Sequence, residues 1–154
     1  GCGNAEALRE LKYTYLKDIY CVGLDLVKRS AKDLGIDEYI SGDAFQEKFP
    51  DNVDFVFSFR ALHEIGRISE IVEKVSHCLA SKGLAVLSIR CQDFDFHKNK
   101  LIFQGQISQK DLDFLNQILL EKEFYFCKVS GNPIFQEANG ITYTAGINLI
   151  LKKE

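Results

Sequence analysis

The sequence lacks several residue types and patterns, and each absence narrows what the protein can be. It contains no methionine, no tryptophan and only two prolines in 154 residues. No apolar run approaches the roughly 20 residues of a membrane-spanning helix, so we expect no membrane association. The five cysteines include no C-x-x-C pair and several lie in apolar segments. This pattern predicts buried free thiols in a reducing cytoplasm.

The sequence also has no excess of basic residues. Its 19 Lys and Arg are outnumbered by 22 Asp and Glu, which gives a net charge of −3. This balance argues against general nucleic-acid binding. The hydrophobic share of 46% and the charged share of 27% are ordinary for a soluble globular protein. A chain of this length can bury one core, so we expect a single domain over residues 1–154.

The most informative segment is the first one, Gly1-Cys2-Gly3-Asn4-Ala5, taken together with Asp25. We expect the two glycines to form a tight turn that opens a helix. Because Gly3 has no Cβ, a ligand can approach the backbone there, and the N–H groups suit a carboxylate or phosphate. Asp25 ends a short apolar segment, so we expect it at the carboxyl tip of a strand. A carboxylate at that place suits ribose hydroxyls.

Apolar periodicity divides the rest of the chain into alternating strands and helices. We expect helices over residues 5–18, 27–34, 60–65, 68–80 and 108–123, and strands over 19–26, 38–41, 53–58, 84–89, 124–129 and 141–151. Residues 92–106 have no clear period and are expected to form an excursion or lid. This alternation predicts an α/β fold with a mostly parallel sheet. The last two strands, joined by a loop with three turn-forming residues (Gly131, Pro133 and Gly140), can pair antiparallel.

The chain begins with Gly1 rather than Met. We therefore expect the native protein to begin upstream. A turn of the kind predicted at the start follows a strand, so we expect the first strand of the sheet to lie before Gly1.

Two families combine a glycine turn with an acidic strand end at this spacing. The dinucleotide fingerprint needs Gly or Ala at its sixth position, which here is Glu6. The third small residue is Ala5, one place earlier. The pattern G-x-G-x-A followed by an acidic strand end resembles the class I S-adenosylmethionine-dependent methyltransferases of small-molecule type. The antiparallel C-terminal strand pair is similar to the same family and implies a Rossmann-like methyltransferase sheet.

The resemblance continues along the chain. The segment 42–44, Gly-Asp-Ala, resembles the turn after the third strand of that family. Residues 54–58 with 61–63 resemble its fourth strand and the helix that follows. Residues 80–84 resemble its L-K-P-G-G turn, except that Lys82 replaces the proline and Leu84 replaces the second glycine. These departures concern a turn and not the ligand.

The resemblance implies S-adenosyl-L-methionine as the cofactor. It implies that the cofactor contacts come from Gly1, Gly3, Asp25, Leu26, Asp43, Ala44, Ser58 and Phe59. In this interpretation Asp25 holds the ribose hydroxyls and Asp43 holds the adenine amine, although Asp43 also suits a simple turn. Phe59 suits a position in the core equally well. Arg60 is a candidate contact to an anionic substrate group, and a surface salt bridge is an equal alternative.

His63 is the candidate general base, because the pKa of histidine lies near neutrality. A packing role, or a role as hydrogen-bond donor, is the alternative. His63 and Glu64 do not form a zinc motif, since Arg67 stands where H-E-x-x-H needs histidine. We therefore expect no metal site.

The leading functional hypothesis is methyl transfer from S-adenosylmethionine to an O, N or C atom of a small molecule. One alternative is a dinucleotide-binding domain of the oxidoreductase type. Another is a non-catalytic methyltransferase relative that acts as a binding partner. The sequence leaves the identity of the acceptor and the oligomeric state open.

Overall fold

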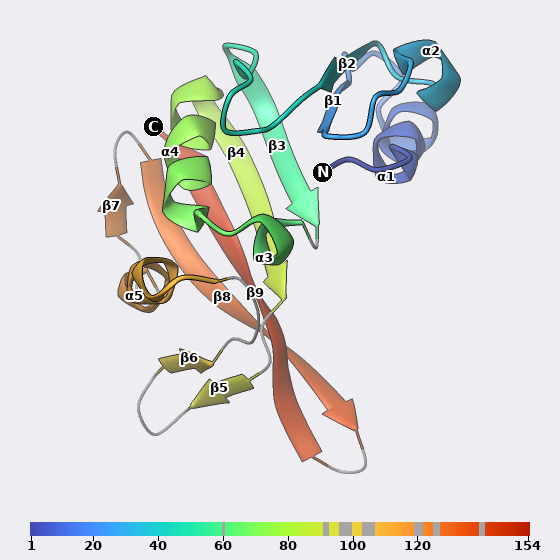
Figure 1. The fold of residues 1–154 in the computed structure, drawn as a ribbon. Helices are drawn as coiled ribbons and strands as arrows, with labels where there is room; N and C mark the ends of the chain where they lie inside the picture. The colour runs from blue at the N-terminus through green and yellow to red at the C-terminus, as the bar shows by residue number, and fades with distance from the viewer. Residues whose placement is uncertain are drawn as a thin grey trace. The chain divides into compact units, whose positions relative to one another are not determined.

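The structure, a computed structural model, describes residues 1–59, 61–90, 93–95, 100–102, 107–118, 122–124, 127–138 and 141–154. These residues form two compact units, Gly1–Lys48 and Phe49–Glu154. Their helices and strands are labelled in Figure 1. The alternation of helices and strands confirms the predicted α/β class.

The first unit contains one pair of parallel strands and short helical turns. Its elements are α1 (Glu6–Glu10), the π-helical turn η1 (Leu11–Tyr15), β1 (Val22–Asp25), α2 (Ala31–Leu34) and β2 (Glu38–Ser41). The register aligns Asp25, at the end of β1, with Ser41 at the end of β2. A small core of Ala5, Cys21, Leu34 and Ile36 lies beneath these elements. The two strands therefore end at the same edge, as parallel pairing requires.

Two helices of this unit are shorter than the sequence predicts. The helix expected over 5–18 ends at Tyr15, after a π-helical turn. The helix expected over 27–34 covers only Ala31–Leu34. Its predicted first turn is absent, and in that segment the N–H group of Val27 donates to the Asp25 carboxylate at 3.1 Å.

The second unit is a five-stranded sheet with helices and a separate short strand pair. Its elements are β3 (Val53–Phe59), α3 (Leu62–Ile65), α4 (Ile68–Cys78), β4 (Leu79–Arg90), β5 (Asp93–Asp95), β6 (Lys100–Ile102), α5 (Gln109–Gln117), β7 (Lys122–Phe124), β8 (Cys127–Ala138) and β9 (Ile141–Lys153). The sheet order is β3-β4-β9-β8-β7. β3 and β4 are parallel, whereas β9, β8 and β7 run antiparallel to their neighbours. The predicted C-terminal antiparallel pair is confirmed.

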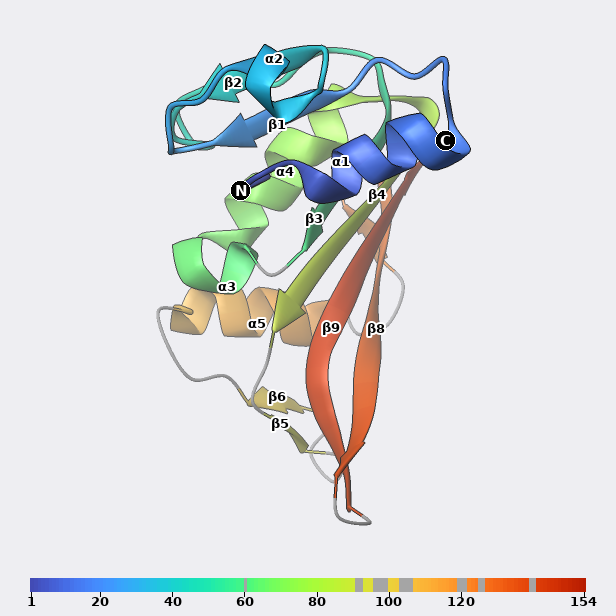
Figure 2. The ribbon, with the colours of Figure 1, turned by 90° about the vertical axis from the view of Figure 1, so that its right-hand side faces the viewer.

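The core of this unit lies between the sheet and its helices. Figure 2 shows α3, α4 and α5 on one side of the sheet. On the buried face, Leu87 lies opposite Leu149 and Ile89 opposite Ile147. These four side chains are at most 1% exposed. Helix α4 buries a matching apolar stripe, as its periodicity predicts: Ile68, Ile71, Val72 and Val75.

The prediction of a tight turn within residues 80–84 has a structural counterpart. Val53 of β3 pairs with Leu79 of β4, and Phe55 pairs with Leu84. Between these two pairs the chain advances by two residues in β3 and by five in β4. The three additional residues of β4 form an irregularity inside the strand. Lys82 adopts a positive φ of 64° there. The residue that replaces the family's proline thus takes the left-handed conformation of a turn.

The C-terminal predictions were partly wrong. The helix expected to reach 123 ends at Gln117, and Glu123 lies in β7. The single strand expected over 124–129 is divided between β7 and β8, which pair antiparallel. The expected loop around Pro133 is part of strand β8, where Pro133 pairs with Ile147 of β9. On the other side of β8, β7 pairs only with residues 127–129, so among the described residues Pro133 lies at an edge of the sheet. An edge strand tolerates the missing N–H of proline.

The expected excursion at 92–106 lies mostly outside the described residues. Its described parts are β5 and β6, which form an antiparallel pair. The cysteine prediction is confirmed for the four described cysteines, all of them free thiols: Cys2, Cys21, Cys78 and Cys127.

Candidate functional site

The amino-terminal turn is fastened to the carboxyl end of β1. The N–H of Gly3 donates to Oδ2 of Asp25 at 2.8 Å. The N–H of Cys2 donates to the carbonyl of Leu24 at 2.9 Å. Gly3 has a positive φ of 52°, a conformation that favours glycine. The structure therefore brings together two of the residues that the sequence singled out, Gly3 and Asp25.

The outer side of this turn is open. An ideal Cβ built on Gly3 has no other atom within 4 Å. By contrast, a Cβ on Gly23 of β1 would lie 2.9 Å from Sγ of Cys2. The glycine of the strand thus accommodates the packed Cys2 side chain, whereas Gly3 borders free space. The Cβ side of Gly3 is open to a ligand, but the N–H groups of Gly3 and Cys2 already donate within the turn, so these two are not the free donors that the sequence predicted.

Asp25 is held as an ionised carboxylate. Partial burial raises its pKa, but the hydrogen bonds from the N–H groups of Gly3 and Val27 lower it, and the nearby charge of Arg29 lowers it further. The net result is a pKa below the usual value for aspartate. A carboxylate has about four acceptor positions, and the two backbone donors use two of them. The remaining positions suit a pair of ligand hydroxyls.

Asp43 and Ala44 follow β2, next to the end of β1. The N–H of Gly42 donates to the carbonyl of Asp25 at 3.0 Å. Oδ1 of Asp43 accepts the N–H of Phe45 at 2.9 Å, which is an Asx turn. The turn predicted for this segment is confirmed, and the adenine contact of Asp43 stays a prediction. Leu26, directly after Asp25, is 68% exposed and offers an apolar surface beside the carboxylate.

The remaining predicted residues belong to the second unit. Ser58 and Phe59 end β3, and the Phe59 ring packs 5.3 Å from the ring of Phe57, measured between centroids. Phe59 is 56% exposed, so it is not a core residue in this structure. Arg60 lies outside the described residues.

His63 lies in the short helix α3 with little solvent exposure. Its Nε2 is 3.1 Å from Oε1 of Glu64, while its Nδ1 is buried and has no hydrogen-bond partner among the described residues. With the proton on Nε2, the Nδ1 lone pair would be free to accept a proton. Because Nδ1 is buried, a substrate would reach it only after a local rearrangement. The geometry is compatible with the base role and with the packing role.

The residues that fix the loop after Asp25 are not among the predicted site residues. The Val27 N–H binds the Asp25 carboxylate, and the hydroxyl of Tyr39 donates to the Val27 carbonyl. Arg29 adds a positive charge nearby. A main-chain N–H donor cannot be recognised from the sequence, because nearly every residue has one. The adjacent basic residues Lys28 and Arg29, which follow the acidic strand end, could have indicated a positive charge near Asp25.

Two other features concern the part of the chain that the structure describes. No group of three His, Cys, Asp or Glu side chains lies close enough there to hold a metal ion. None of the described helices has the length and apolar character needed to cross a bilayer.

Comparison with known proteins agrees with the resemblance in the sequence. A family model described as a methyltransferase domain matches residues 1–87, which is more than half of the chain. No curated protein matches the sequence.

Solved structures share the fold. A SAM-dependent methyltransferase from Archaeoglobus fulgidus matches with a TM-score of 0.62 and 15% identity, over 99% of this chain and 83% of that one. The Burkholderia thailandensis 1,6-didemethyltoxoflavin-N1-methyltransferase, solved with S-adenosylhomocysteine, matches with a TM-score of 0.56 and 13% identity, over 97% and 68%. The cyclase SpnF matches with a TM-score of 0.65 and 11% identity, over 99% and 72%. At these identities the similarity establishes the fold alone.

Proposed function

The chain belongs to the methyltransferase-domain family, and from this premise we propose that it transfers a methyl group from S-adenosylmethionine to a small molecule. The acceptor atom is an O, N or C atom. The observation that carries the proposal is the contact between Gly3 and Asp25 at 2.8 Å. It places an open backbone turn beside an ionised carboxylate at a strand end, and such an arrangement suits an adenosyl ligand.

Each residue at the turn has a distinct role in this proposal. Asp25 accepts hydrogen bonds from the two ribose hydroxyls through the acceptor positions that Gly3 and Val27 leave free. The turn at Gly1 and Gly3 supports the amino-acid end of the cofactor. Asp43 and Ala44 contact the adenine. These contacts fix the position of the cofactor before the acceptor arrives.

The bound cofactor supplies a methyl group that its sulfonium already activates. The chain therefore has to align the acceptor rather than provide a nucleophile, and such orientation can supply about 7–11 kcal/mol of barrier reduction. Ser58 and Phe59 line the reacting region in this proposal, and Arg60 holds an anionic group of the acceptor. His63 takes up the proton that the acceptor loses, through Nδ1, after the local rearrangement that exposes this atom.

The proposal extends to the whole chain and its setting. Residues 1–154 act as one S-adenosylmethionine-binding domain without a metal. The buried free thiols Cys21, Cys78 and Cys127 suit a reducing cytoplasm. The partner is a small-molecule acceptor, with no general nucleic-acid binding.

Two measurements on the intact chain test this function. A thermal-shift assay with S-adenosylhomocysteine and, separately, NAD separates the cofactor classes. We expect stabilisation by S-adenosylhomocysteine alone, because binding to the native state raises the melting temperature. Transfer of a radiolabelled methyl group to a panel of phenols, amines and carbon acids then tests turnover. Stabilisation by NAD alone would contradict the cofactor assignment.

The second candidate function is a binding protein of the same family without turnover. The buried Nδ1 of His63 is the observation that favours it, because the candidate base is not within reach of an acceptor in this structure. Binding of S-adenosylhomocysteine with no methyl transfer to any acceptor would support this candidate and contradict the enzymatic proposal.

A further inference from the structure

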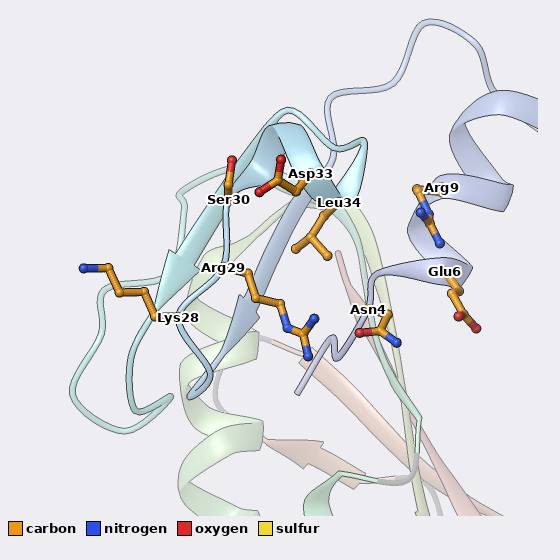
Figure 3. Close-up of a pocket in the computed structure, with 8 residues that line it drawn as sticks. All are labelled: Asn4, Glu6, Arg9, Lys28, Arg29, Ser30, Asp33 and Leu34. Atoms are coloured by element: carbon orange, nitrogen blue, oxygen red, sulfur yellow. The ribbon is translucent and has the colours of Figure 1, made fainter.

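The first unit contains a cavity of about 480 Å³ between the segments around α1 and α2. Figure 3 shows the side chains that line it. Asp25 and Gly3 are not among the lining residues. The lining includes Asn4, which follows Gly3 in the sequence, and Arg29, which lies in the loop after Asp25. The cavity is therefore separate from the proposed ribose contact and adjoins it along the chain. Its size is in the range of small-molecule sites.

Positive charge outweighs negative charge in the lining. Three cations, Arg9, Lys28 and Arg29, line the cavity together with two acids, Glu6 and Asp33. In Figure 3 the Arg29 guanidinium is directed toward Asn4, whereas the Lys28 side chain extends away from the other residues. This local excess of positive charge occurs in a chain whose net charge is −3.

The two guanidinium groups are available to a ligand. Within the described parts of the chain, neither Arg9 nor Arg29 has a hydrogen-bonded or ion-paired acid. The stem of Arg9 packs beside Gly35, where an ideal Cβ would lie 3.1 Å from its Cδ. The glycine at this position therefore leaves room for the arginine side chain. Packing of the stem holds Arg9 in place, and Arg9 is one of the residues that line the cavity.

The remaining lining residues indicate the chemical class of the ligand. Asn4 and Ser30 add neutral hydrogen-bond donors, and Leu34, which is 6% exposed, adds an apolar surface. Arginine forks bind phosphate and carboxylate oxygens with two parallel hydrogen bonds. Donors that approach from several sides suit the three oxygens of a phosphate better than the two of a carboxylate. We propose that this cavity binds the phosphate group of a small phosphate monoester.

Titration of the full chain with inorganic phosphate and with ribose 5-phosphate tests the proposal. Amide chemical shifts are followed by two-dimensional NMR, with ribose as the uncharged control and acetate as the carboxylate control. We expect saturable shifts at residues 4–9 and 28–34 with both phosphate probes. Ribose should cause none, and acetate should bind more weakly. Binding of acetate as tight as that of phosphate would overturn the choice of phosphate.

Charge-neutralising variants locate the site. Arg9→Gln and Arg29→Gln should each weaken phosphate binding by about tenfold, as expected for the loss of a charged hydrogen bond. Lys32→Gln removes the same charge from α2 but does not line the cavity, and it should change binding by less than about twofold. Equal weakening in all three variants would show general electrostatic attraction and overturn the proposal.

Two lysine variants cover the case in which a glutamine variant does not fold, and a second ligand tests the cofactor separately. If either glutamine variant fails to fold, Arg9→Lys and Arg29→Lys keep the charge but lose the fork, and each should still weaken binding severalfold. Unchanged binding in the lysine variants would overturn the assignment. Because the readout does not involve methyl transfer, the proposal stands or falls independently of the cofactor. A parallel titration with S-adenosylhomocysteine reports on the cofactor separately.

Discussion

At the residue scale, the proposed cofactor site depends on the surroundings of Asp25. A strand ends at this carboxylate, and two backbone N–H groups bind it. These bonds hold its pKa below the usual value despite partial burial, so it remains charged at neutral pH. A charged acceptor makes the stronger hydrogen bonds to hydroxyl groups.

Replacement of Asp25 tests its role in cofactor binding. Asp25→Ala should weaken binding of S-adenosylhomocysteine by about tenfold or more, or roughly 1.4 kcal/mol, because the ribose loses charged hydrogen bonds. Isothermal titration calorimetry measures the change. Asp18→Ala removes an exposed acid of the same unit and should leave the affinity unchanged. Equal affinities in the wild type and Asp25→Ala would remove this residue from the site.

Cys78 provides a test of burial in the second unit. Burial raises the pKa of its thiol from 9.0 to about 11. The unfolded chain therefore loses this proton at a lower pH than the folded chain. The stability that the thiol contributes is complete below about pH 9 and is lost as the pH rises toward 11.

The measurement is denaturant unfolding of the wild type and Cys78→Ala between pH 7 and 11. The difference in unfolding free energy should be constant up to about pH 9 and then shrink by about 1.4 kcal/mol per pH unit. Parallel profiles across the whole range would contradict the burial of this thiol.

Much of the site at this scale was predictable. The position of Asp25 at a strand end and the open turn at Gly3 followed from residue type and spacing. The bond between Asp25 and the Val27 N–H was not predictable, because a main-chain donor is the same at every residue except proline.

At the element scale, one side chain fixes the start of α4. Asp111 of α5 is 1% exposed, and its carboxylate accepts the N–H groups of Arg67 at 3.1 Å and Ile68 at 2.6 Å. The same carboxylate accepts the hydroxyl of Ser108 at 2.7 Å. Ser108 and Asp111 also form the local capping box of α5. The contact with α4 spans more than 40 residues and has no local pattern.

Loss of this carboxylate should destabilise the second unit. Asp111→Ala removes the acceptor of the buried Ile68 N–H and of the partly buried Arg67 N–H, at an expected cost of about 2–4 kcal/mol in the unfolding free energy. Asp113→Ala changes an exposed acid of the same helix and should cost less than about 0.5 kcal/mol. Urea denaturation measures both. Similar values for the two variants would show that Asp111 does not hold α4 to α5.

Gly131 shows why the C-terminal strands were harder to predict. Glycine and proline in that segment indicated a loop, yet Gly131 lies inside β8 and its N–H donates to the carbonyl of Ile118 at 2.8 Å. A Cβ there would lie 2.8 Å from Cδ1 of Ile147 and 3.2 Å from the Ile118 carbonyl oxygen. The glycine thus permits close packing of the end of α5 on the sheet. Such a contact depends on tertiary structure, which the local sequence does not encode.

At the scale of the whole molecule, the prediction of a single domain can be measured. The structure has two compact units, divided after Lys48. If they act as one domain, calorimetry should show one transition whose calorimetric and van't Hoff enthalpies agree. S-adenosylhomocysteine should shift this single transition upward. Two separate transitions, with only one shifted by the ligand, would contradict the prediction.

The family assignment covers residues 1–87 and so reaches into both units. The shared fold does not by itself fix the reaction, since SpnF, a cyclase, also matches it. Binding of S-adenosylmethionine is the first requirement of a functional methyltransferase domain, and turnover is tested separately. We propose that S-adenosylmethionine binds at the turn around Gly3 and at the carboxyl ends of β1 and β2.

Hydrogen exchange measured by mass spectrometry, with and without S-adenosylhomocysteine, tests this assignment most directly. We expect slower exchange with the ligand than without it in peptides that cover residues 1–5, 25–27 and 42–46. Peptides from the β8–β9 pair should exchange at the same rate in both samples. Binding of the ligand without any change in the first three segments would contradict the account.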